Sequence, residues 1–446
     1  MPQNSQNKLT YFIGIGGIGI SALARWYKAH GFRIQGSDLS PSSTTKELAS
    51  EGAMIKIGPH NAGNLPPEAS CVIYNQAISQ DNPELLKARK LKIPTFSYPE
   101  RLGELTRMYK TVAIAGAHGK STTTSLTSLI LEKAGFDPTV IVGTKLKEFA
   151  PPQEGNNFKN GKGEYLVIEA DEWKASFLHY FPYAALITNI DREHLDFYKN
   201  LSDIKKAFLR FISNIHPYGL VVLNKDNKNL YSLKNKIKKP VVWYSIKSKN
   251  AAAIKKVLRI PGAHNLSNAV GAYTLTKALG VKHKPALKAL AAYTGAWRRS
   301  ELRGQVFGAE IFDDYGHHPT EIKATLAGFK EKYSDHKIIC VFQPHQRKRL
   351  KLLFKDFTRA FNSADELILL DIYGVAGRDE DKKSSSSQNL AVAVQKETRR
   401  NVGVAATLSE LTSLLKEKIK QPTKTTIIMM GAGDINEWTN SLLCLP

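Results

Sequence analysis

The sequence predicts an α/β protein built from parallel β-sheets with helices on their faces. Its 446 residues are enough for about three domains of roughly 150 residues each. Short apolar segments alternate with helical segments along the chain, which is the pattern of repeated strand–helix–strand units. Polar residues follow most of the predicted strands, and open parallel sheets bind their ligands at that edge.

The first strand–helix junction carries a glycine-rich loop. The segment LTYFIGIGGIGISALA predicts a strand, a turn and a helix, with Gly14, Gly16 and Gly19 in the pattern G-x-G-x-x-G. Glycines in such a loop let the backbone approach a diphosphate closely. Asp38 ends the next predicted strand, RIQGSD, where its carboxylate can accept hydrogen bonds from ribose hydroxyls. The loop predicts binding of either a dinucleotide such as NAD or a nucleotide diphosphate such as a UDP-sugar.

A second glycine loop opens the next strand–helix block and predicts a nucleoside triphosphate site. The segment VAIAGAHGKSTTT places Gly116, Gly119, Lys120 and Ser121 between an apolar strand and a helix. Backbone N–H groups and the helix N-terminus attract phosphate, lysine neutralises the β- and γ-phosphates, and the next hydroxyl can bind Mg²⁺. Ile114 stands where a full Walker A loop has glycine, so the match is to the short pattern G-x-x-G-K-S.

Acidic residues follow two apolar segments of this second block. Glu169, Asp171 and Glu172 end the predicted strand in YLVIEADE, and Asp191 and His194 follow the strand in LITNIDREH. Carboxylates and an imidazole at neighbouring strand ends can hold Mg²⁺ above a phosphate loop. A third block begins near residue 298, and its apolar segments AEIFDD, HKIICVF, DELILLD and TTIIMM also end in polar residues.

Cysteine usage and the first residues predict a cytoplasmic protein. The three cysteines lie far apart and form no C-x-x-C pair, so neither a disulfide framework nor a zinc site is expected. The polar start MPQNSQNKLT lacks the positive and apolar regions of a signal peptide. The sequence has no run of about 18 apolar residues, so we expect no membrane partner.

The formal net charge of +23 raises the question of a nucleic-acid partner. The lysines are spread along the chain, with one denser stretch from Lys225 to Arg259. That stretch lacks the interleaved aromatic residues that stack on bases. We therefore interpret the charge as a solvated basic surface with sites for small anions, and expect no nucleic-acid partner.

The order of the motifs resembles that of the Mur ligases. The resemblance extends from Phe12 to Asp434 and is carried by FIGIGGIGISALA, GSD, GAHGKSTTT, EADEWKASFLH, TNIDREHLDFY, PGAHNLSNA, DDYGHHPTEI, FQPH and MGAGDI. The motif DDYGHHP is similar to that of the family member that adds L-alanine. The resemblance implies a Rossmann-like UDP-substrate domain (1–105), a central P-loop ATPase-like α/β domain (106–297) and a Rossmann-like C-terminal domain (298–446) that closes over the site. It also implies a monomer or homodimer that uses ATP and Mg²⁺ to join L-alanine to UDP-N-acetylmuramate through an acyl phosphate, in peptidoglycan precursor synthesis.

The resemblance also implies roles for individual residues. The catalytic residues are Lys120, Glu169 and His194, and the metal ligands are Ser121, Glu169 and His194. The ATP-binding residues are Gly116, Ala117, His118, Gly119, Lys120, Ser121, Thr122, His264, Asn265, Asn268, Arg299 and Asp314. The residues that bind the UDP-substrate are Gly14, Gly16, Gly17, Gly19, Asp38, His317 and Arg349.

Three departures from the family pattern leave alternatives open. Trp173-Lys174 replaces a small and an acidic residue, Ser300 replaces an aromatic residue, and Gln346 replaces an arginine. The first alternative is a ligase that recycles murein tripeptide, or one with an altered choice of amino acid. The others are a nicotinamide-dependent dehydrogenase, suggested by G-x-G-x-x-G alone, and a non-catalytic UDP-sugar sensor.

Overall fold

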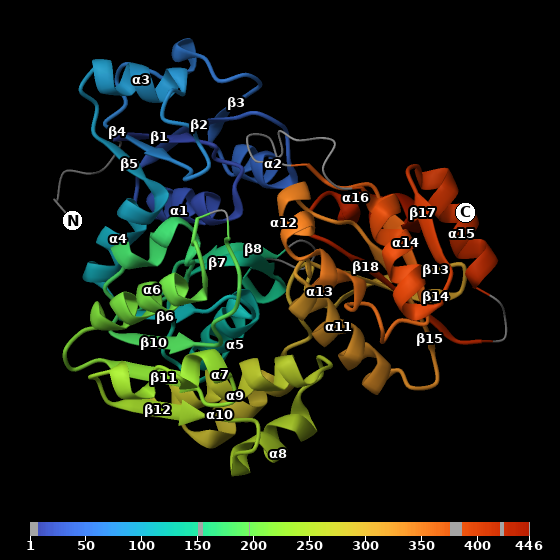
Figure 1. The fold of residues 1–446 in the computed structure, drawn as a ribbon. Helices are drawn as coiled ribbons and strands as arrows, with labels where there is room; N and C mark the ends of the chain where they lie inside the picture. Colours follow the sequence, from blue (N-terminus) through green and yellow to red (C-terminus); the bar gives the residue numbers. More distant parts are fainter. Residues whose placement is uncertain (1–7, 150–154, 196, 375–385, 420–422, 446) are drawn as a thin grey trace. The chain divides into compact units, whose positions relative to one another are not determined.

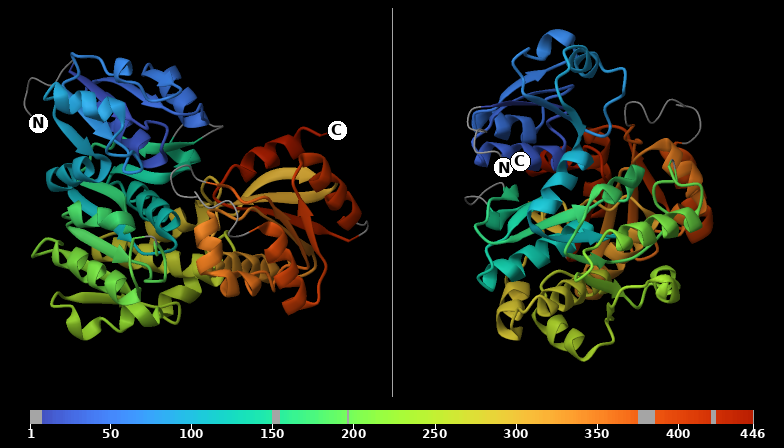
Figure 2. Two further views of the ribbon diagram at one scale, coloured as in Figure 1. Left: turned by 45° about the horizontal axis from the view of Figure 1, so that its top comes forward. Right: turned by 90° about the vertical axis from the view of Figure 1, so that its left-hand side faces the viewer.

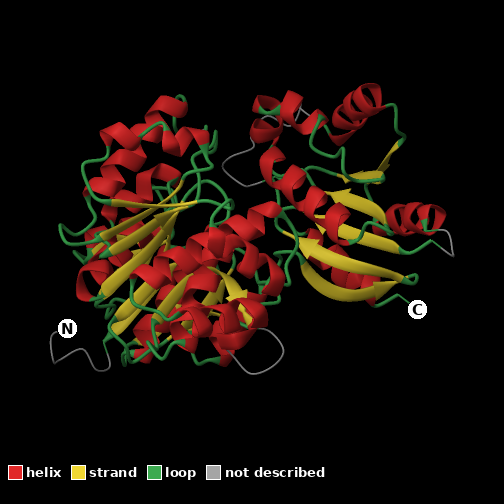
Figure 3. Cartoon of the chain, turned by 90° about the horizontal axis from the view of Figure 1, so that it is seen from below, coloured by secondary structure: helices red, strands yellow, loops and turns green. Residues whose placement is uncertain are grey.

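The computed structural model describes residues 8–149, 155–195, 197–374, 386–419 and 423–445, which form three β-sheets with helices on their faces (Figures 1 and 3). The predicted α/β class is confirmed. The chain divides into two compact units. Residues 1–257 with 267–291 contain the first two sheets, and residues 258–266 with 292–446 contain the third. No helix in the described ranges is both long enough and apolar enough to cross a membrane.

The first sheet has five parallel strands in the order β3-β2-β1-β4-β5. Its elements are β1 (Leu9–Ile13), α1 (Ile18–Ala29), β2 (Arg33–Asp38), α2 (Ser43–Ser50), β3 (Met54–Ile57), β4 (Cys71–Tyr74), α3 (Pro83–Lys90), β5 (Thr95–Ser97) and α4 (Tyr98–Met108). Side chains of β1 alternate between the faces, as strand geometry requires. Tyr11 and Ile13 pack with Leu85 of α3, whereas Phe12 packs with Leu23 of α1. Helices α1 and α3 therefore cover opposite faces (Figure 1).

The second sheet has seven strands in the order β12-β11-β10-β6-β9-β7-β8, all parallel to their neighbours except β8, which is antiparallel to β7. Its strands are β6 (Lys110–Ala115), β7 (Thr139–Leu146), β8 (Asn156–Lys159), β9 (Tyr165–Ala170), β10 (Ala184–Ile187), β11 (Leu220–Asn224) and β12 (Val241–Tyr244). Its helices are α5 (Lys120–Lys133), η3 (Trp173–His179), α6 (Leu201–Ser213), α7 (Lys228–Tyr231), η4 (Lys234–Lys236), α8 (Lys249–Val257), α9 (Ala263–Ala278) and α10 (His283–Ala292). Because β6 lies between β9 and β10, the segments that follow these three strands meet at one edge.

The third sheet has the order β13-β14-β18-β15-β16-β17, and β13 alone among these strands runs antiparallel to its neighbour. Its strands are β13 (Glu301–Val306), β14 (Ala309–Asp314), β15 (Lys337–Phe342), β16 (Glu366–Leu370), β17 (Val402–Ala405) and β18 (Thr425–Met430). Its helices are α11 (Pro319–Lys332), α12 (Arg347–Leu352), α13 (Phe354–Thr358), α14 (Ser387–Thr398), α15 (Leu408–Lys418) and α16 (Ile435–Leu443), shown in orange and red in Figure 2. Ile311, Val341, Ile368 and Met429 form its core with residues of α15 and α16.

One apolar core joins the first two sheets and encloses a buried cation. Trp26 of α1 belongs to the same buried cluster as Ile141 and Phe158 of the second sheet. Beside it, the Arg25 side chain is only 3% exposed and donates hydrogen bonds to Asn157 of β8 and to Glu47 of α2. A charge this deeply buried is tolerated only when its hydrogen bonds are satisfied.

Arg25→Ala tests this buried contact. Removal of the guanidinium group takes a hydrogen bond from each of Glu47, Glu51 and Asn157, although Lys145 still pairs with Glu47, and should lower the free energy of unfolding by about 3 kcal/mol. Urea unfolding followed by circular dichroism measures the change. The exposed pair of Lys110 and Glu164 provides the control, because Lys110→Ala should cost less than about 1 kcal/mol. Equal losses in both variants would contradict the proposed role of Arg25.

Candidate functional site

The second glycine loop connects β6 to α5 at the carboxyl edge of the second sheet. Gly116 has a φ of 130° and Gly119 a φ of 81°, values that strain any residue with a Cβ. A Cβ at Gly119 would also lie 2.4 Å from Oδ1 of Asn268. Glycine is therefore required for the loop to turn tightly here and to pack against the predicted ATP-binding residue Asn268.

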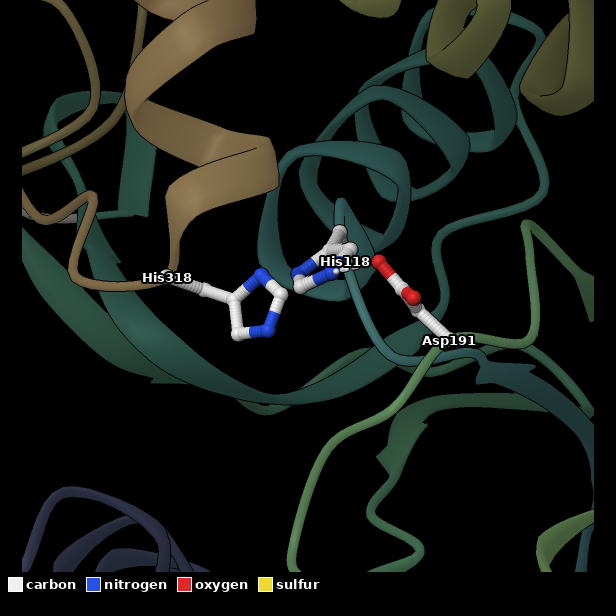
Figure 4. A group of neighbouring side chains, drawn as sticks. All are labelled: His118, Asp191 and His318. Atoms are coloured by element: carbon white, nitrogen blue, oxygen red, sulfur yellow. Dashed lines mark hydrogen bonds and ion pairs between the residues drawn. The ribbon is translucent and has the colours of Figure 1, made fainter. Parts of the chain in front are cut away.

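Residues after β10 fix the conformation of this loop. Oδ1 of Asn189 accepts a hydrogen bond from the His118 N–H at 2.9 Å, and its Nδ2 donates to the His118 carbonyl at 2.9 Å. The Thr188 hydroxyl donates to the same carbonyl at 2.7 Å. Nε2 of His118 lies 3.1 Å from Oδ2 of Asp191, and the two side chains face each other in Figure 4. The loop is thus held in place before any phosphate binds.

Lys120, the first residue of α5, lies among carboxylates. Its Nζ donates to the Gly116 carbonyl at 2.7 Å and to Oε2 of Glu172 at 3.0 Å, and lies 3.7 Å from Oδ1 of Asp171. Burial alone would lower the pKa of the Lys120 amine, but the carboxylates of Glu172 and Asp171 outweigh it and raise that pKa above its usual range. Lys120 is therefore fully charged at neutral pH.

The predicted metal ligands fall into two neighbouring groups. The Ser121 hydroxyl donates to Oε2 of Glu169 at 3.2 Å, and Oε1 of Glu169 accepts from the Gly143 N–H at 2.6 Å. His194 lies instead beside Asp171 and Glu172, and one ligand atom of each of these three residues lies within 4.8 Å of the others. The structure therefore brings His194 to carboxylates other than Glu169.

Glu172 was expected from its strand-end position to be one of several possible Mg²⁺ ligands, although the resemblance to the Mur ligases gave it no individual role. Its side chain is 2% exposed, and its Oε1 lies 3.6 Å from Nε2 of His194. Among the described residues, this buried Oε1 has no hydrogen-bond partner. A buried carboxylate oxygen without a donor favours a cation. The signal in the sequence was its place three residues after Glu169 at the same strand end.

The first glycine loop lies at the carboxyl end of β1. Gly14 has a φ of 72°, and the Gly16 N–H donates to Oδ2 of Asp38 at 2.8 Å. A Cβ at Gly17 would lie 2.4 Å from Nδ2 of Asn75, and one at Gly19 would lie 3.0 Å from the Tyr98 hydroxyl. The structure therefore brings all five predicted residues of this loop region together. It adds Asn75 and Tyr98, which the sequence analysis did not identify.

Lys174, part of the departure Trp173-Lys174, connects the segment after β9 to the segment after β4 by a hydrogen bond. Nζ of Lys174 donates to the Gln76 carbonyl at 3.1 Å and lies 4.7 Å from the centre of the Trp173 indole. The Ser176 hydroxyl donates to Oε1 of Gln76 at 2.6 Å. Lys174 and Ala175 have φ values of 48° and 58°, so tertiary contacts hold this segment in a strained conformation. Lys174 is therefore engaged in a contact with the residue that follows Asn75.

Within the second unit, Asp314 is the centre of one polar group. The N–H of Ser300 and its hydroxyl donate to Oδ2 of Asp314 at 2.9 and 3.2 Å, so the departure at Ser300 supplies a donor to this carboxylate. Burial raises the pKa of Asp314. The Arg298 guanidinium donates to the Gly431 carbonyl at 2.6 Å, and that of Arg299 lies 4.9 Å from the centre of the Tyr315 ring.

The other predicted residues of this unit lie in two further groups. Asn265 donates to the Pro261 carbonyl at 2.7 Å, and burial lowers the pKa of His264 to about 4, so His264 is neutral at pH 7. Nδ1 of His345 lies 3.1 Å from Nη1 of Arg349, and the His345 ring lies 6.0 Å from that of His317. His345, which ends the motif FQPH, thus connects two residues that the sequence analysis predicted separately.

Three family descriptions match the chain. They are "Mur ligase family, catalytic domain" over residues 9–110, "Mur ligase middle domain" over residues 114–276, and "Mur ligase, glutamate ligase domain" over residues 298–433. The sequence is 38% identical to the UDP-N-acetylmuramate–L-alanine ligase of Carboxydothermus hydrogenoformans, with 97% of this chain and 96% of the relative covered. It is 37% identical to the enzyme of that name from Aquifex aeolicus, with 98% and 97% covered.

Solved structures agree with these matches. The UDP-N-acetylmuramate-alanine ligase of Thermotoga maritima superposes with a TM-score of 0.79 at 26% identity, and 98% of each chain is covered. A murein peptide ligase from Psychrobacter arcticus superposes with a TM-score of 0.68 at 23% identity, also over 98% of each chain. The second likeness concerns the fold alone.

The electrostatic pairing of Lys120 and Glu172 makes a measurable prediction. Glu172→Gln removes the nearest negative charge, so the pKa of Lys120 should fall and its uncharged fraction at pH 9 should rise. Acetic anhydride labelling of Lys120, followed by peptide mass spectrometry, measures that fraction. Lys133, exposed at the other end of α5, should be labelled at the same rate in both proteins. An unchanged Lys120 rate would contradict the pairing.

Proposed function

The chain belongs to the Mur ligase family, and we propose that it joins L-alanine to UDP-N-acetylmuramate with conversion of ATP to ADP and phosphate. Full-length relatives of that name, at 37–38% identity, support the proposal. The observation that carries the chemistry is the charged Lys120 at the N-terminus of α5, surrounded by Glu172, Asp171 and His194. The proposed place of this reaction is the cytoplasm, where ATP is available.

The reaction must bring two anions together. In the proposed mechanism, the lactyl carboxylate of the sugar attacks the γ-phosphorus of ATP, which forms an acyl phosphate and releases ADP. The amine of L-alanine then attacks the acyl carbon, loses a proton and displaces phosphate. The Lys120 ammonium and the N-terminus of α5 stabilise the charge on the phosphoryl group as it is transferred. Water must be kept out, because it hydrolyses an acyl phosphate.

The residues near Lys120 fit Mg²⁺ as the accompanying cation. Glu172 offers a buried carboxylate oxygen without a hydrogen-bond donor, and His194 and Asp171 lie within ligand distance of each other and of it. Glu169 and the Ser121 hydroxyl form the second predicted group. Bound Mg²⁺ would neutralise phosphate charge and hold the phosphate oxygens in position. Lys120 keeps its own contacts to the loop carbonyl of Gly116 in this arrangement.

We also propose the three-domain division at residues 1–105, 106–297 and 298–446. The first glycine loop, with Asp38 bonded to Gly16, is assigned to the UDP diphosphate and ribose. His264, Asn265 and Asn268 are assigned to the adenine side of ATP, and Arg299 and Asp314 to the nucleotide. His317 and Arg349 are assigned to the UDP-substrate. A monomer or homodimer fits this division, because each chain contains all three sheets.

Phosphate release with ATP and UDP-N-acetylmuramate tests the proposal directly. The assay is run with L-alanine, L-serine, glycine and the murein tripeptide as separate amine donors. We expect L-alanine to give the highest kcat/KM. Preference for the tripeptide would replace this proposal with the recycling ligase, and the absence of release with every amine would favour a non-catalytic role.

The two glycine loops should fail separately. Lys120→Ala should abolish turnover and leave binding of UDP-N-acetylmuramate within about threefold of wild type, because the lysine serves only the second loop. Gly16→Val should instead abolish binding of UDP-N-acetylmuramate and leave ATP binding intact. The valine side chain would displace Asp38 and block the diphosphate. Isothermal titration calorimetry with each ligand measures both effects. Comparable loss of both ligands in either variant would contradict the assignment of the loops.

His194 and Glu169 should act through the metal rather than through proton transfer. Glu169→Gln and His194→Ala should each lower kcat by about 10³-fold and weaken Mn²⁺ binding, which electron paramagnetic resonance measures. Their combined effect should be less than additive, since both disable one phosphate-binding unit. Positional isotope exchange in ATP without L-alanine separates the alternatives. Exchange at the wild-type rate in His194→Ala would indicate that His194 is instead a base for the amine.

A further inference from the structure

The positive charge of the protein is concentrated in one segment. Residues 199–297 contain 17 lysines and two arginines but only two aspartates and no glutamate. This segment therefore carries most of the net charge of +23 of the whole chain. The catalytic residues assigned above need only a few cations, so they do not account for this excess.

A group of basic and aromatic residues on neighbouring elements of this segment is exposed or half-exposed, and we call this group the basic face. Its members are Lys205, Lys206, Arg210, Lys234, Lys236, Lys238 and Lys239, with Tyr218 and Tyr231. Nζ of Lys205 on α6 donates to the Ser232 hydroxyl at 3.0 Å, which joins α6 to the segment after α7. Nζ of Lys239 donates to the His216 carbonyl at 3.2 Å, which joins that segment to the loop before β11. These elements lie together at the lower left of Figure 1.

The basic face is poorly neutralised. Lys206 is 74% exposed and pairs with Asp203 at 3.4 Å, and this is the one ion pair of the basic face among the described residues. Lys234 lies 4.7 Å from the centre of the Tyr231 ring and, within the part of the chain that the structure describes, forms no ion pair with an acidic side chain. Like charges held close together repel one another, so a negatively charged partner stabilises them.

The basic face also extends away from the catalytic edge. Tyr218 and Lys239 precede β11 and β12, so they lie at the amino edge of the second sheet. The phosphate loop follows β6, which is parallel to these strands within that sheet, and lies at the carboxyl edge. A partner that covers the amino end of the basic face therefore leaves Lys120 accessible to ATP.

We propose that the basic face binds the surface of a membrane rich in anionic phospholipid. Lysine dominates the segment, and its mobile point charge suits a diffuse negative surface, whereas base recognition favours the planar fork of arginine. Tyr218 is 88% exposed among these lysines, and tyrosine is favoured at membrane–water interfaces. The ring of Tyr231 is occupied by Lys234 and Trp243, so it is not presented for base stacking. This proposal departs from the expectation of no membrane partner, which rested only on the lack of an apolar run long enough to span a membrane.

Vesicle co-sedimentation tests the proposal with the full-length protein. Vesicles of equal parts phosphatidylglycerol and phosphatidylcholine should bind the protein at low salt, and phosphatidylcholine vesicles should not. Each basic residue near such a surface contributes about fivefold in affinity. The variant Lys206→Gln, Lys234→Gln, Lys236→Gln, Lys238→Gln should therefore bind at least tenfold more weakly, with its ligase activity unchanged.

A matched variant removes the same charge elsewhere. Lys56→Gln, Lys90→Gln, Lys92→Gln, Lys133→Gln changes four exposed lysines outside the basic face and should keep vesicle binding within about threefold. Equal losses in the two variants would overturn the proposal, because total charge would then be sufficient. So would equal binding to both kinds of vesicle, or no binding to either. Tighter binding to duplex DNA or RNA than to anionic vesicles would assign the basic face to nucleic acid instead.

Discussion

The pairing of the half-buried Lys120 ammonium group with Glu172 and Asp171 is the interaction on which the site depends. A lysine at a helix N-terminus faces the positive end of the helix dipole, which is unfavourable for a cation. Glu172 and Asp171 offset that cost, and the carbonyl of Gly116 completes the coordination of the amine. The same carboxylates would repel a nucleotide phosphate. A divalent cation bound between the carboxylates and the phosphate would reduce this repulsion. The carboxylates and the phosphate could then both lie close to Lys120.

This arrangement explains why the segment after β9 is strained. It must place Glu172 beside Lys120 and then reach the first sheet within a few residues. Lys174 and Ala175 adopt left-handed backbone conformations, and His194 does so after β10. Such conformations cost of order 1–3 kcal/mol each and persist only where surrounding contacts enforce them. Here the enforcing contacts include those to Gln76, so the conformation of the segment that carries Glu172 depends on the residues beside the first glycine loop.

Sequence reasoning succeeded where the signal is local. The strand RIQGSD was predicted with the bounds that β2 has, and both glycine loops lie at strand–helix junctions as expected. Among the strands that it missed, β3 and β12 lie at sheet edges and expose Met54 and Val242, so they lack a buried apolar run. It also missed β7, although that strand is buried and lies between β9 and β8. It named Glu172 only as one of several possible Mg²⁺ ligands, and it gave His345 no individual role. Which of several polar residues after a strand points into the site depends on tertiary contacts, and spacing alone does not encode them.

The chain uses its positive charges in two different ways. Where one cation must meet a defined group, the chain uses a buried or half-buried residue that donates several hydrogen bonds, as at Arg25 and Lys120. The basic face instead uses exposed lysines on flexible stems, whose attraction to an anion is weak individually and is screened by salt. Such a surface cannot position a phosphate for chemistry. It can hold a large anionic surface loosely, and because each contact is weak, release requires no single strong interaction to break.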